Sequence, residues 1–499
     1  MSQLHGIDVE RADEFQAAPT HAVEPLPPAL VRELRSVLGE TGVIIDPGAL
    51  LVWESDGLTA YRVTPRGVLL PQDTAQTSTV MKILARESIP FVPRGSGTGL
   101  SGGALALEGA VVISFSRMSK ILEIDARNRR ARVQPGVVNS ALSAATAGYN
   151  LYYAPDPSSQ TVCTIGGNVA ENAGGPHCLK YGVTLNHILG LTVVMPDGGV
   201  MQLGSRGETI GYDLLGLFIG SEGTFGIATE IEVRLSPIPA AVQTLAALFD
   251  DVNDATRAVS AVIAEGMLPA ALEMVDREAL IAVEKSVYAA GLPTDINALL
   301  IIEFDGRGPG LAEEAQRAVE LCKRGGAREV RIAIDAPDRQ RMWYARKKAF
   351  GAMGQLAPDI LVQDAVVPRS KLPGVLSQVY EIAARYNLRL CNMFHAGDGN
   401  LHPTLVFDRR DADQVSRVEK ASREMMSACV DAGGSITGEH GVGLDKREYM
   451  ELIFGLREMQ VMCDVRRAFN PRGLANPAKV LPIRVCREWA GPATRRADA

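Results

Sequence analysis

The chain has 499 residues, of which 46% are hydrophobic, and its formal net charge is −7 at pH 7. At about 150 residues per domain, this length indicates about three domains with enough apolar material for sizeable cores. The negative charge argues against a nucleic-acid partner, because phosphate-binding surfaces carry an excess of Lys and Arg.

The cysteines and the hydropathy pattern indicate a cytoplasmic protein. No CxxC pair occurs among the seven cysteines, which are Cys163, Cys178, Cys322, Cys391, Cys429, Cys463 and Cys486. We therefore expect reduced thiols and no iron–sulfur cluster within this chain. No apolar run approaches the ~20 residues that cross a bilayer, and the N-terminus lacks the apolar region of a signal peptide. The sequence thus predicts no direct membrane span.

In chain order, the first predicted unit alternates helices and strands. A polar N-terminal arm leads to a helix near residues 31–38. A strand at 68–71, a helix that begins at Asp73 or Thr74, and a strand at 90–93 follow. Because another strand begins at Val111, we interpret this region as an α/β unit.

The loop after the strand at 90–93 is rich in glycine. Gly97, Gly99 and Gly102 match the dinucleotide motif GxGxxG, which should open a helix. Only eight residues separate Gly102 from the strand at Val111, so a Rossmann helix does not fit. We interpret the loop as a nest of backbone N–H groups for a pyrophosphate, and a flexible surface loop is the alternative. Glycine clusters at 155–175 and 216–230 indicate one long ligand that lies across several loops.

The segment from residue 241 to residue 335 has a different pattern. Strands at TLAALF, AALEMVD, ALLIIEF and REVRIAI alternate with helices at 253–265, 277–288 and 311–324. This alternation predicts a ferredoxin-like sheet in a layer separate from the glycine-rich half. The segment SPIPA, at 236–240, is the expected linker.

Two further motifs suggest a metal site. NMFHAGDGNLHP, at 392–403, places His395 and His402 on either side of a tight turn, and GSITGEHGVG, at 434–443, contains Glu439 and His440. Two imidazoles and a carboxylate are a common ligand set for zinc, iron or manganese. Alternatively, the two histidines satisfy core hydrogen bonds and Glu439 lies on a solvated turn.

Together these motifs resemble a known family. PRGSGTG, PDPSS with IGGNVAENAGG, and GSEGTFGIATE resemble the flavin-binding segments of the FAD-linked oxidases of the vanillyl-alcohol-oxidase superfamily. HAGDGNLHP and GEHGVG resemble the metal site of its D-2-hydroxyacid dehydrogenase group. With ARKKAF at 345–350 and FNPRGLANPAKV at 469–480, the chain is most similar to the FAD subunits of bacterial glycolate oxidases, over about residues 40–485.

This resemblance implies an α+β fold in which a two-subdomain FAD-binding fold carries a central ferredoxin-like substrate cap. The implied divisions are an N-terminal arm over 1–40, the FAD-binding domain over 41–240, the cap over 241–430, a C-terminal segment over 431–485 that returns to the FAD domain, and a tail over 486–499.

The resemblance also implies which residues hold FAD. They are Pro93, Arg94, Gly95, Ser96, Gly97, Thr98, Gly99, Pro155, Asp156, Ser159, Gly166, Gly167, Asn168, Asn172, Gly175, Glu222, Gly223, Ile227 and Asn476. Relatives that bond FAD covalently through the first loop carry histidine where this chain has Thr98, so we expect non-covalent FAD.

The implied activity is oxidation of a small 2-hydroxy acid, glycolate or D-lactate, to glyoxylate or pyruvate, with hydride transfer to flavin N5. A divalent metal on His395, His402 and Glu439 would acidify the substrate hydroxyl, and His440 would accept its proton. Arg346 is the expected partner of the substrate carboxylate, because its guanidinium can bind both oxygens. Among so many charged neighbours, Arg346 could instead lie on a solvated face.

The electrons must then leave the chain. By resemblance, the expected partners are an iron–sulfur subunit and a second flavoprotein-like subunit, and the chain would lie in the cytoplasm or reach the inner membrane through them. A stand-alone D-lactate or other D-2-hydroxyacid dehydrogenase with a different acceptor is the alternative. A metallohydrolase would leave the glycine clusters unexplained, and a flavin or metal storage protein would not need His440 beside Glu439.

Overall fold

The computed structural model describes residues 24–204 and 211–486. Most of the predicted N-terminal arm and nearly all of the predicted tail lie outside the described residues. Within the described residues, no helix is both long enough and apolar enough to cross a membrane.

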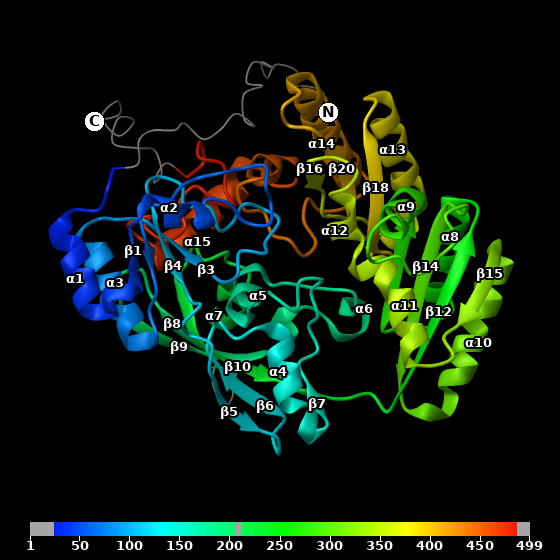
Figure 1. The fold of residues 1–499 in the computed structure, drawn as a ribbon, viewed down its shortest axis with the longest axis horizontal. Helices are drawn as coiled ribbons and strands as arrows, with labels where there is room; N and C mark the ends of the chain where they lie inside the picture. The colour runs from blue at the N-terminus through cyan, green and yellow to red at the C-terminus, as the bar shows by residue number, and fades with distance from the viewer. Residues whose placement is uncertain (1–23, 205–210, 487–499) are drawn as a thin grey trace.

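The N-terminal part begins with a small sheet in the order β1-β2-β4-β3, in which β2 and β3 run parallel to β4 (Figure 1). Its elements are α1 (Pro28–Leu38), β1 (Val43–Ile44), α2 (Pro47–Leu50), β2 (Val68–Leu69), α3 (Thr74–Arg86), β3 (Phe91–Arg94) and β4 (Val111–Ser114). Asp73 caps α3 by accepting a hydrogen bond from the Gln76 N–H. Leu34, Met81 and Phe91 share one buried core, so α1 and α3 pack with β3.

A second sheet follows, with antiparallel strands in the order β5-β6-β10-β8-β9. The elements of this part are β5 (Ile121–Asp125), β6 (Arg130–Val133), α4 (Asn139–Thr146), β7 (Leu151–Tyr152), α5 (Ile165–Glu171), α6 (Cys178–Tyr181), β8 (Ile188–Val194), β9 (Val200–Leu203), α7 (Leu214–Phe218), β10 (Ile227–Arg234) and β11 (Ser236–Pro237). Buried residues alternate with more exposed ones along β10, because successive side chains point to opposite faces of the sheet.

The glycine-rich loop after β3 lacks the helix that a Rossmann motif requires, as the sequence predicted. Residues 95–110, between β3 and β4, contain no helix. This confirms that the GxGxxG match is not a Rossmann motif.

The cap contains a sheet in the order β15-β12-β14-β13-β18-β19-β17. Its elements are β12 (Ala241–Phe249), α8 (Val252–Ala264), β13 (Ala271–Asp276), α9 (Arg277–Glu284), β14 (Ala298–Gly306), α10 (Gly308–Arg324), β15 (Ala327–Ile332), α11 (Ala336–Lys347), α12 (Ala349–Met353), β16 (Asp359–Val362), β17 (Ala365–Val366), α13 (Leu372–Arg385), β18 (Arg389–His395), β19 (Asn400–Leu401), β20 (Pro403–Phe407) and α14 (Ala412–Asp431). The first four strands follow the order fourth, first, third, second with antiparallel pairing. This arrangement confirms the ferredoxin-like prediction.

The apolar run in β14 is explained by burial on both faces of the cap sheet. Leu300 and Ile302 share a core with residues of α8, α10 and α13. Leu299 and Ile301 share a separate core with residues of α9, α11 and α12. Because both faces are covered, β14 is a continuous hydrophobic stretch and not an alternating one.

The last described segment lies beside the first sheet (Figure 1). Beyond α15 (Leu456–Phe469), the Phe91 N–H donates to the Leu474 carbonyl at 2.9 Å and the Asn476 N–H donates to the Phe91 carbonyl at 2.8 Å. The residue limits of the predicted domains stay predictions.

One expectation about the cysteines is wrong. Cys463 and Cys486 form a disulfide, with their Cα atoms 5.9 Å apart, although the sequence suggested reduced thiols only. The two residues are 23 positions apart and meet because the C-terminal segment packs against α15. The remaining cysteines are free.

Candidate active site

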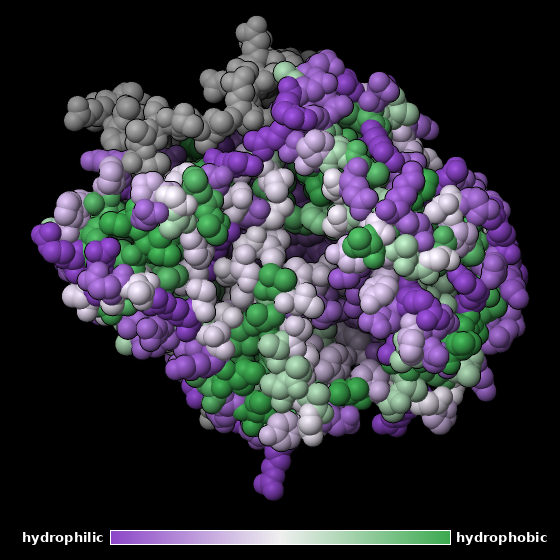
Figure 2. Space-filling view, viewed as in Figure 1, coloured by the Kyte–Doolittle hydropathy of each residue, from purple (hydrophilic) through white to green (hydrophobic). Residues whose placement is uncertain are grey.

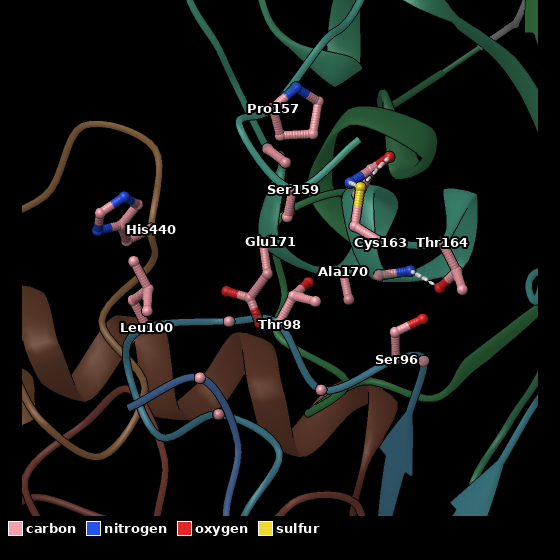
Figure 3. A pocket seen from close by; sticks show the side chains of 18 of the residues that line it. Ser96, Thr98, Leu100, Pro157, Ser159, Cys163, Thr164, Ala170, Glu171 and His440 are labelled. Carbon is pink, nitrogen blue, oxygen red and sulfur yellow. Dashed lines mark hydrogen bonds between the residues drawn. The ribbon is translucent and has the colours of Figure 1, made fainter. Parts of the chain in front are cut away.

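A cavity of about 640 Å³ lies between the N-terminal part and the cap, and the surface is hollowed between them (Figure 2). Its lining comes from the glycine-rich loops, from α11 and β18 of the cap, and from the segment that carries Glu439 and His440. Thr98, Ser159, Glu171 and His440 surround this space (Figure 3). The cavity therefore joins the segments that the sequence predicted to bind FAD and metal.

Most residues predicted to hold FAD line the cavity. They are Pro93, Arg94, Gly95, Ser96, Gly97, Thr98, Gly99, Ser159, Gly166, Gly167, Asn168, Glu222, Gly223, Ile227 and Asn476. Pro155, Asp156, Asn172 and Gly175 are not part of the lining. The Asp156 carboxylate contacts the His177 ring at 2.8 Å, and Asn172 accepts a hydrogen bond from the Leu185 N–H at 2.8 Å. These two side chains thus hold neighbouring loops together.

The first glycine loop exposes backbone donors to the cavity. Within the described residues, no backbone carbonyl accepts a hydrogen bond from the N–H groups of residues 96–100. Gly97 has φ of 70°, and a Cβ there would lie 2.3 Å from Arg94 Nη2, so only glycine fits. Such a run of free N–H groups suits the pyrophosphate of FAD, and we conclude that the loop fits this cofactor.

Arg94 and Ser96 have structural partners. Arg94 Nη2 donates to the Ser55 carbonyl at 2.7 Å, and burial lowers the pKa of its guanidinium. The Ser96 hydroxyl donates to the Val162 carbonyl at 2.6 Å, which ties the first glycine loop to the second. Both side chains therefore shape the loop, and they leave its backbone N–H groups available.

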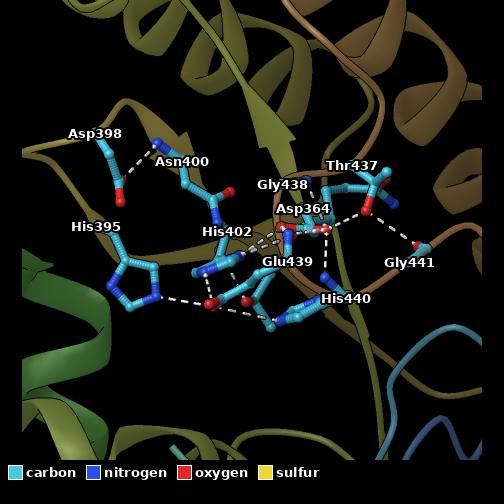
Figure 4. Close-up of polar contacts among 12 residues, drawn as sticks. Asp364, His395, Asp398, Asn400, His402, Thr437, Gly438, Glu439, His440 and Gly441 are labelled. Carbon is cyan, nitrogen blue, oxygen red and sulfur yellow. Dashed lines mark hydrogen bonds and ion pairs between the residues drawn. The ribbon is translucent and has the colours of Figure 1, made fainter. Parts of the chain in front are cut away.

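The predicted metal ligands converge on one point (Figure 4). His395 Nε2 lies 2.8 Å from Glu439 Oε1, and His402 Nε2 lies 3.3 Å from the same oxygen. The donor atoms of these three residues all lie within 4.8 Å of one another. The arrangement follows from the hairpin of β18 and β19, in which His395 pairs with Asn400 and the turn brings His402 back.

The other ring nitrogen of each histidine has its own partner. His395 Nδ1 lies 2.7 Å from Glu273 Oε1, and His402 Nδ1 lies 3.3 Å from the Gln363 carbonyl oxygen. Such contacts fix the tautomer in which Nε2 carries the free lone pair for a metal. Glu273 lies directly opposite His395 in the pairing of β13 with β18. The donor set and its supporting shell fit a divalent metal.

The charges at this point are tightly balanced. Although burial lowers the pKa of His395, the carboxylates of Glu273 and Glu439 raise it well above its ordinary value. Burial raises the pKa of Glu439, yet His395 and His402 hold it well below its usual range. The two carboxylates thus favour a positive charge at this point, which a divalent cation would supply on binding.

His440 faces the cavity beside these ligands. Its ring stacks on His402 with centroids 4.8 Å apart, and its Nε2 lies 4.0 Å from Glu439 Oε1. Burial lowers the pKa of His440 to about 4, so its imidazole is neutral at neutral pH. Its Nδ1 is buried and has no partner in the described part of the chain. A neutral imidazole with an unused nitrogen is able to accept a proton.

Arg346 is not on a solvated face, so that alternative is wrong. It is 5% exposed, its Nε donates to Glu273 Oε2 at 2.6 Å, and it lines the cavity. Glu273 therefore connects Arg346 with His395. The guanidinium retains N–H groups that could bind a carboxylate in the cavity.

Glu171 was missed by the sequence analysis, and it lies in a buried pair of carboxyl groups with Glu222. A Cβ on Gly441 would lie 2.4 Å from Glu171 Oε2 and 2.8 Å from Glu222 Oε1, so both groups adjoin that glycine. Burial raises the pKa of Glu171 well above its usual range, and Glu222 raises it further. Both residues line the cavity. A neutral Glu171 would place a hydrogen-bond donor on this wall.

Comparison with known proteins agrees with this geometry. Residues 65–204 match a FAD binding domain, and residues 238–480 match the C-terminal domain of FAD linked oxidases. The chain is 45% identical to the glycolate oxidase subunit GlcD of Escherichia coli (strain K12), covering 88% of each chain. It is 33% identical to a D-lactate dehydrogenase of Anaerostipes hadrus, covering 85% of this chain and 91% of that protein.

Solved structures show the same fold at low sequence identity. p-Cresol methylhydroxylase with substrate bound matches with a TM-score of 0.76 and 16% identity, covering 91% of this chain and 97% of that chain. The 4-ethylphenol oxidase from Gulosibacter chungangensis matches with a TM-score of 0.73 and 18% identity, covering 92% and 98%.

Proposed function

The chain belongs to the FAD linked oxidases, as its motifs predicted, and we propose that it oxidises glycolate or D-lactate to the 2-oxo acid with metal assistance. The observation that carries this proposal is the common cavity. The glycine loops, His402, Glu439, His440 and Arg346 all line it, so a flavin and a small acid could meet there.

We assign each side chain a part in the reaction. Bound FAD would supply a hydride acceptor at N5, and a divalent metal on His395, His402 and Glu439 would acidify the substrate hydroxyl. His440 accepts the hydroxyl proton on its neutral imidazole. Arg346 holds the substrate carboxylate and thereby orients the Cα–H bond.

The arrangement of these groups supports the roles that we assign to Arg346 and His395. Glu273 fixes Arg346 and His395 at the same time, with contacts of 2.6 and 2.7 Å. The carboxylate-binding group and a metal ligand thus share one rigid support. A substrate with a hydroxyl next to its carboxylate could contact both, which favours 2-hydroxy acids over simple alcohols.

The names of two relatives support different substrates and electron acceptors. The Escherichia coli relative is named as a subunit, which supports a multi-subunit arrangement, and we propose that an iron–sulfur subunit and a second flavoprotein-like subunit receive the electrons. In that arrangement the chain would reach the inner membrane through its partners. The relative named D-lactate dehydrogenase supports the alternative of a stand-alone enzyme with another acceptor.

Initial rates on a panel of D- and L-2-hydroxy acids, with an artificial dye as acceptor, test the reaction. We expect activity on glycolate or D-lactate. The two acids differ by one methyl group, and an apolar pocket discriminates one such group by only about 1–3 kcal/mol. Inactivity on the whole panel would refute the proposal. Affinity purification from the native cell, with iron analysis, separates the subunit proposal from the stand-alone enzyme.

A further inference from the structure

The segment that carries Glu439 and His440 is bound to a single carboxylate. Asp364 accepts hydrogen bonds from the N–H groups of Gly438 at 3.0 Å, Glu439 at 3.2 Å and His440 at 2.9 Å (Figure 4). It also accepts one from the Thr437 hydroxyl at 2.6 Å. Every residue from 437 to 440 therefore donates to Asp364.

Asp364 also has a counter-ion. Lys446 Nζ lies 3.0 Å from Asp364 Oδ2, and both side chains are 0% exposed. A buried carboxylate that lacked a cation would be strongly destabilising. Lys446 comes seven residues after Glu439. The ion pair therefore links the chain beyond Glu439 and His440 to the same carboxylate.

A second carboxylate holds the continuation of the segment. Glu222 accepts hydrogen bonds from the N–H groups of Val442 and Gly443, each at 2.7 Å. Gly441 lies between the two sets of contacts and has φ of 82°, in the left-handed region that favours glycine. Residues 437–443 are thus held by Asp364 from the cap and by Glu222 from the N-terminal part.

The donors around Asp364 Oδ2 argue against a metal on that oxygen. Its carboxylate adjoins His402 and His440, and these three residues could form a metal-binding group by distance alone. However, Asp364 Oδ2 already accepts from Thr437, Gly438, His440 and Lys446. A positive ammonium group at 3.0 Å would also repel a divalent cation.

We propose that Asp364, neutralised by Lys446, is a positioning residue that presents Glu439 to the metal and His440 to the substrate. This inference rests on the metal site of the proposed function. Supporting contacts of this kind typically change metal affinity by about 10–100-fold when they are lost.

The test is a Zn²⁺ titration of the FAD-loaded, metal-stripped protein, repeated with Mn²⁺. We expect Asp364→Asn to weaken Zn²⁺ binding about 10–100-fold with its FAD content unchanged. The control is Asp359→Asn, because Asp359 is a buried aspartate of β16 that accepts from the Arg409 N–H at 3.0 Å. It should bind Zn²⁺ as the parent does.

Lys446→Met distinguishes positioning from ligation. If Asp364 positions the segment, removal of its counter-ion weakens Zn²⁺ binding. If Asp364 is a ligand, the same change frees it for the cation and strengthens binding, which would overturn the proposal. Should Asp364→Asn fail to fold, Thr437→Val removes one donor and should weaken Zn²⁺ binding in the same direction.

Two further outcomes would overturn the proposal. An Asp364→Asn protein that binds Zn²⁺ within threefold of the parent would show that the contacts to Asp364 do not determine the position of Glu439. The metal site of the proposed function would not be contradicted by that result. A parent protein that binds neither Zn²⁺ nor Mn²⁺ would refute the metal site of the proposed function and the inference together.

Discussion

Replacement of Glu273 by Gln should damage the metal site and leave FAD binding intact. Glu273 is 0% exposed and accepts from Arg346 Nε at 2.6 Å, while its other oxygen contacts His395 Nδ1 at 2.7 Å. A glutamine offers only one oxygen. If that oxygen faces His395, the amide NH₂ meets the Arg346 N–H, donor against donor.

The opposite amide orientation is also unfavourable. The NH₂ group would then donate to His395 Nδ1, which forces the ring proton onto Nε2, the atom that must hold the metal. In either orientation we expect a loss of about 10–100-fold in Zn²⁺ affinity, or about 1.4–2.8 kcal/mol. Reduction of the flavin by substrate should slow in parallel.

Zn²⁺ titration and anaerobic rapid mixing measure the two effects. The matched control is Glu278→Gln, because Glu278 pairs with Arg389 at the other end of β18, where the side chains are 39% and 43% exposed. Exposed pairs contribute little, so this variant should behave as the parent. Zn²⁺ affinity and reduction rate within threefold of the parent in Glu273→Gln would refute this reasoning.

Further predictions concern the cofactor, the base and the contact between the two parts of the molecule. Acid precipitation should release all FAD and leave colourless protein, because Thr98 cannot form a histidyl bond; flavin that stays with the precipitate would contradict this. His440→Asn should keep FAD and metal and slow flavin reduction by about 10²–10⁴, and a rate within threefold of the parent would place the base elsewhere. His177 contacts Asp156 at 2.8 Å and Glu303 at 3.2 Å; burial lowers its pKa, but these carboxylates raise it to about 10. The stabilisation from protonated His177 is therefore complete below about pH 6.5 and lost as the pH rises through about 10. Thermal scans should show a smaller decline in melting temperature over this pH range for His177→Gln than for the parent.

The sequence was sufficient for features that local patterns encode. The elements of the cap from β12 to β15 follow the predicted alternation of strands and helices, and the hairpin at His395 and His402 follows from the turn between them. The glycine-rich loop after β3 was recognised because no helix could fit before β4. In each case a few neighbouring residues determine the structure.

Supporting residues could not be found in this way. Glu273 is 122 positions from His395, and Asp364 is 76 positions from His440, so only the folded sheet brings them together. The sequence gives one indication of Glu273 and Asp364: each is a charged residue inside or at the edge of a predominantly apolar strand, as in AALEMVD and LVQDAV. Such a residue is rarely buried without a partner, so its position indicates that a partner exists. The disulfide of Cys463 with Cys486 depends likewise on tertiary packing.

Anaerobic mixing of the FAD- and metal-loaded protein with glycolate or D-lactate tests the central claim most directly, with His402→Ala as the comparison. The flavin of the parent should be fully reduced, whereas His402→Ala should retain its FAD, lose its metal and remain oxidised. Reduction of the variant at the rate of the parent, or failure of both acids to reduce the parent, would contradict a metal-assisted oxidation of 2-hydroxy acids in this cavity.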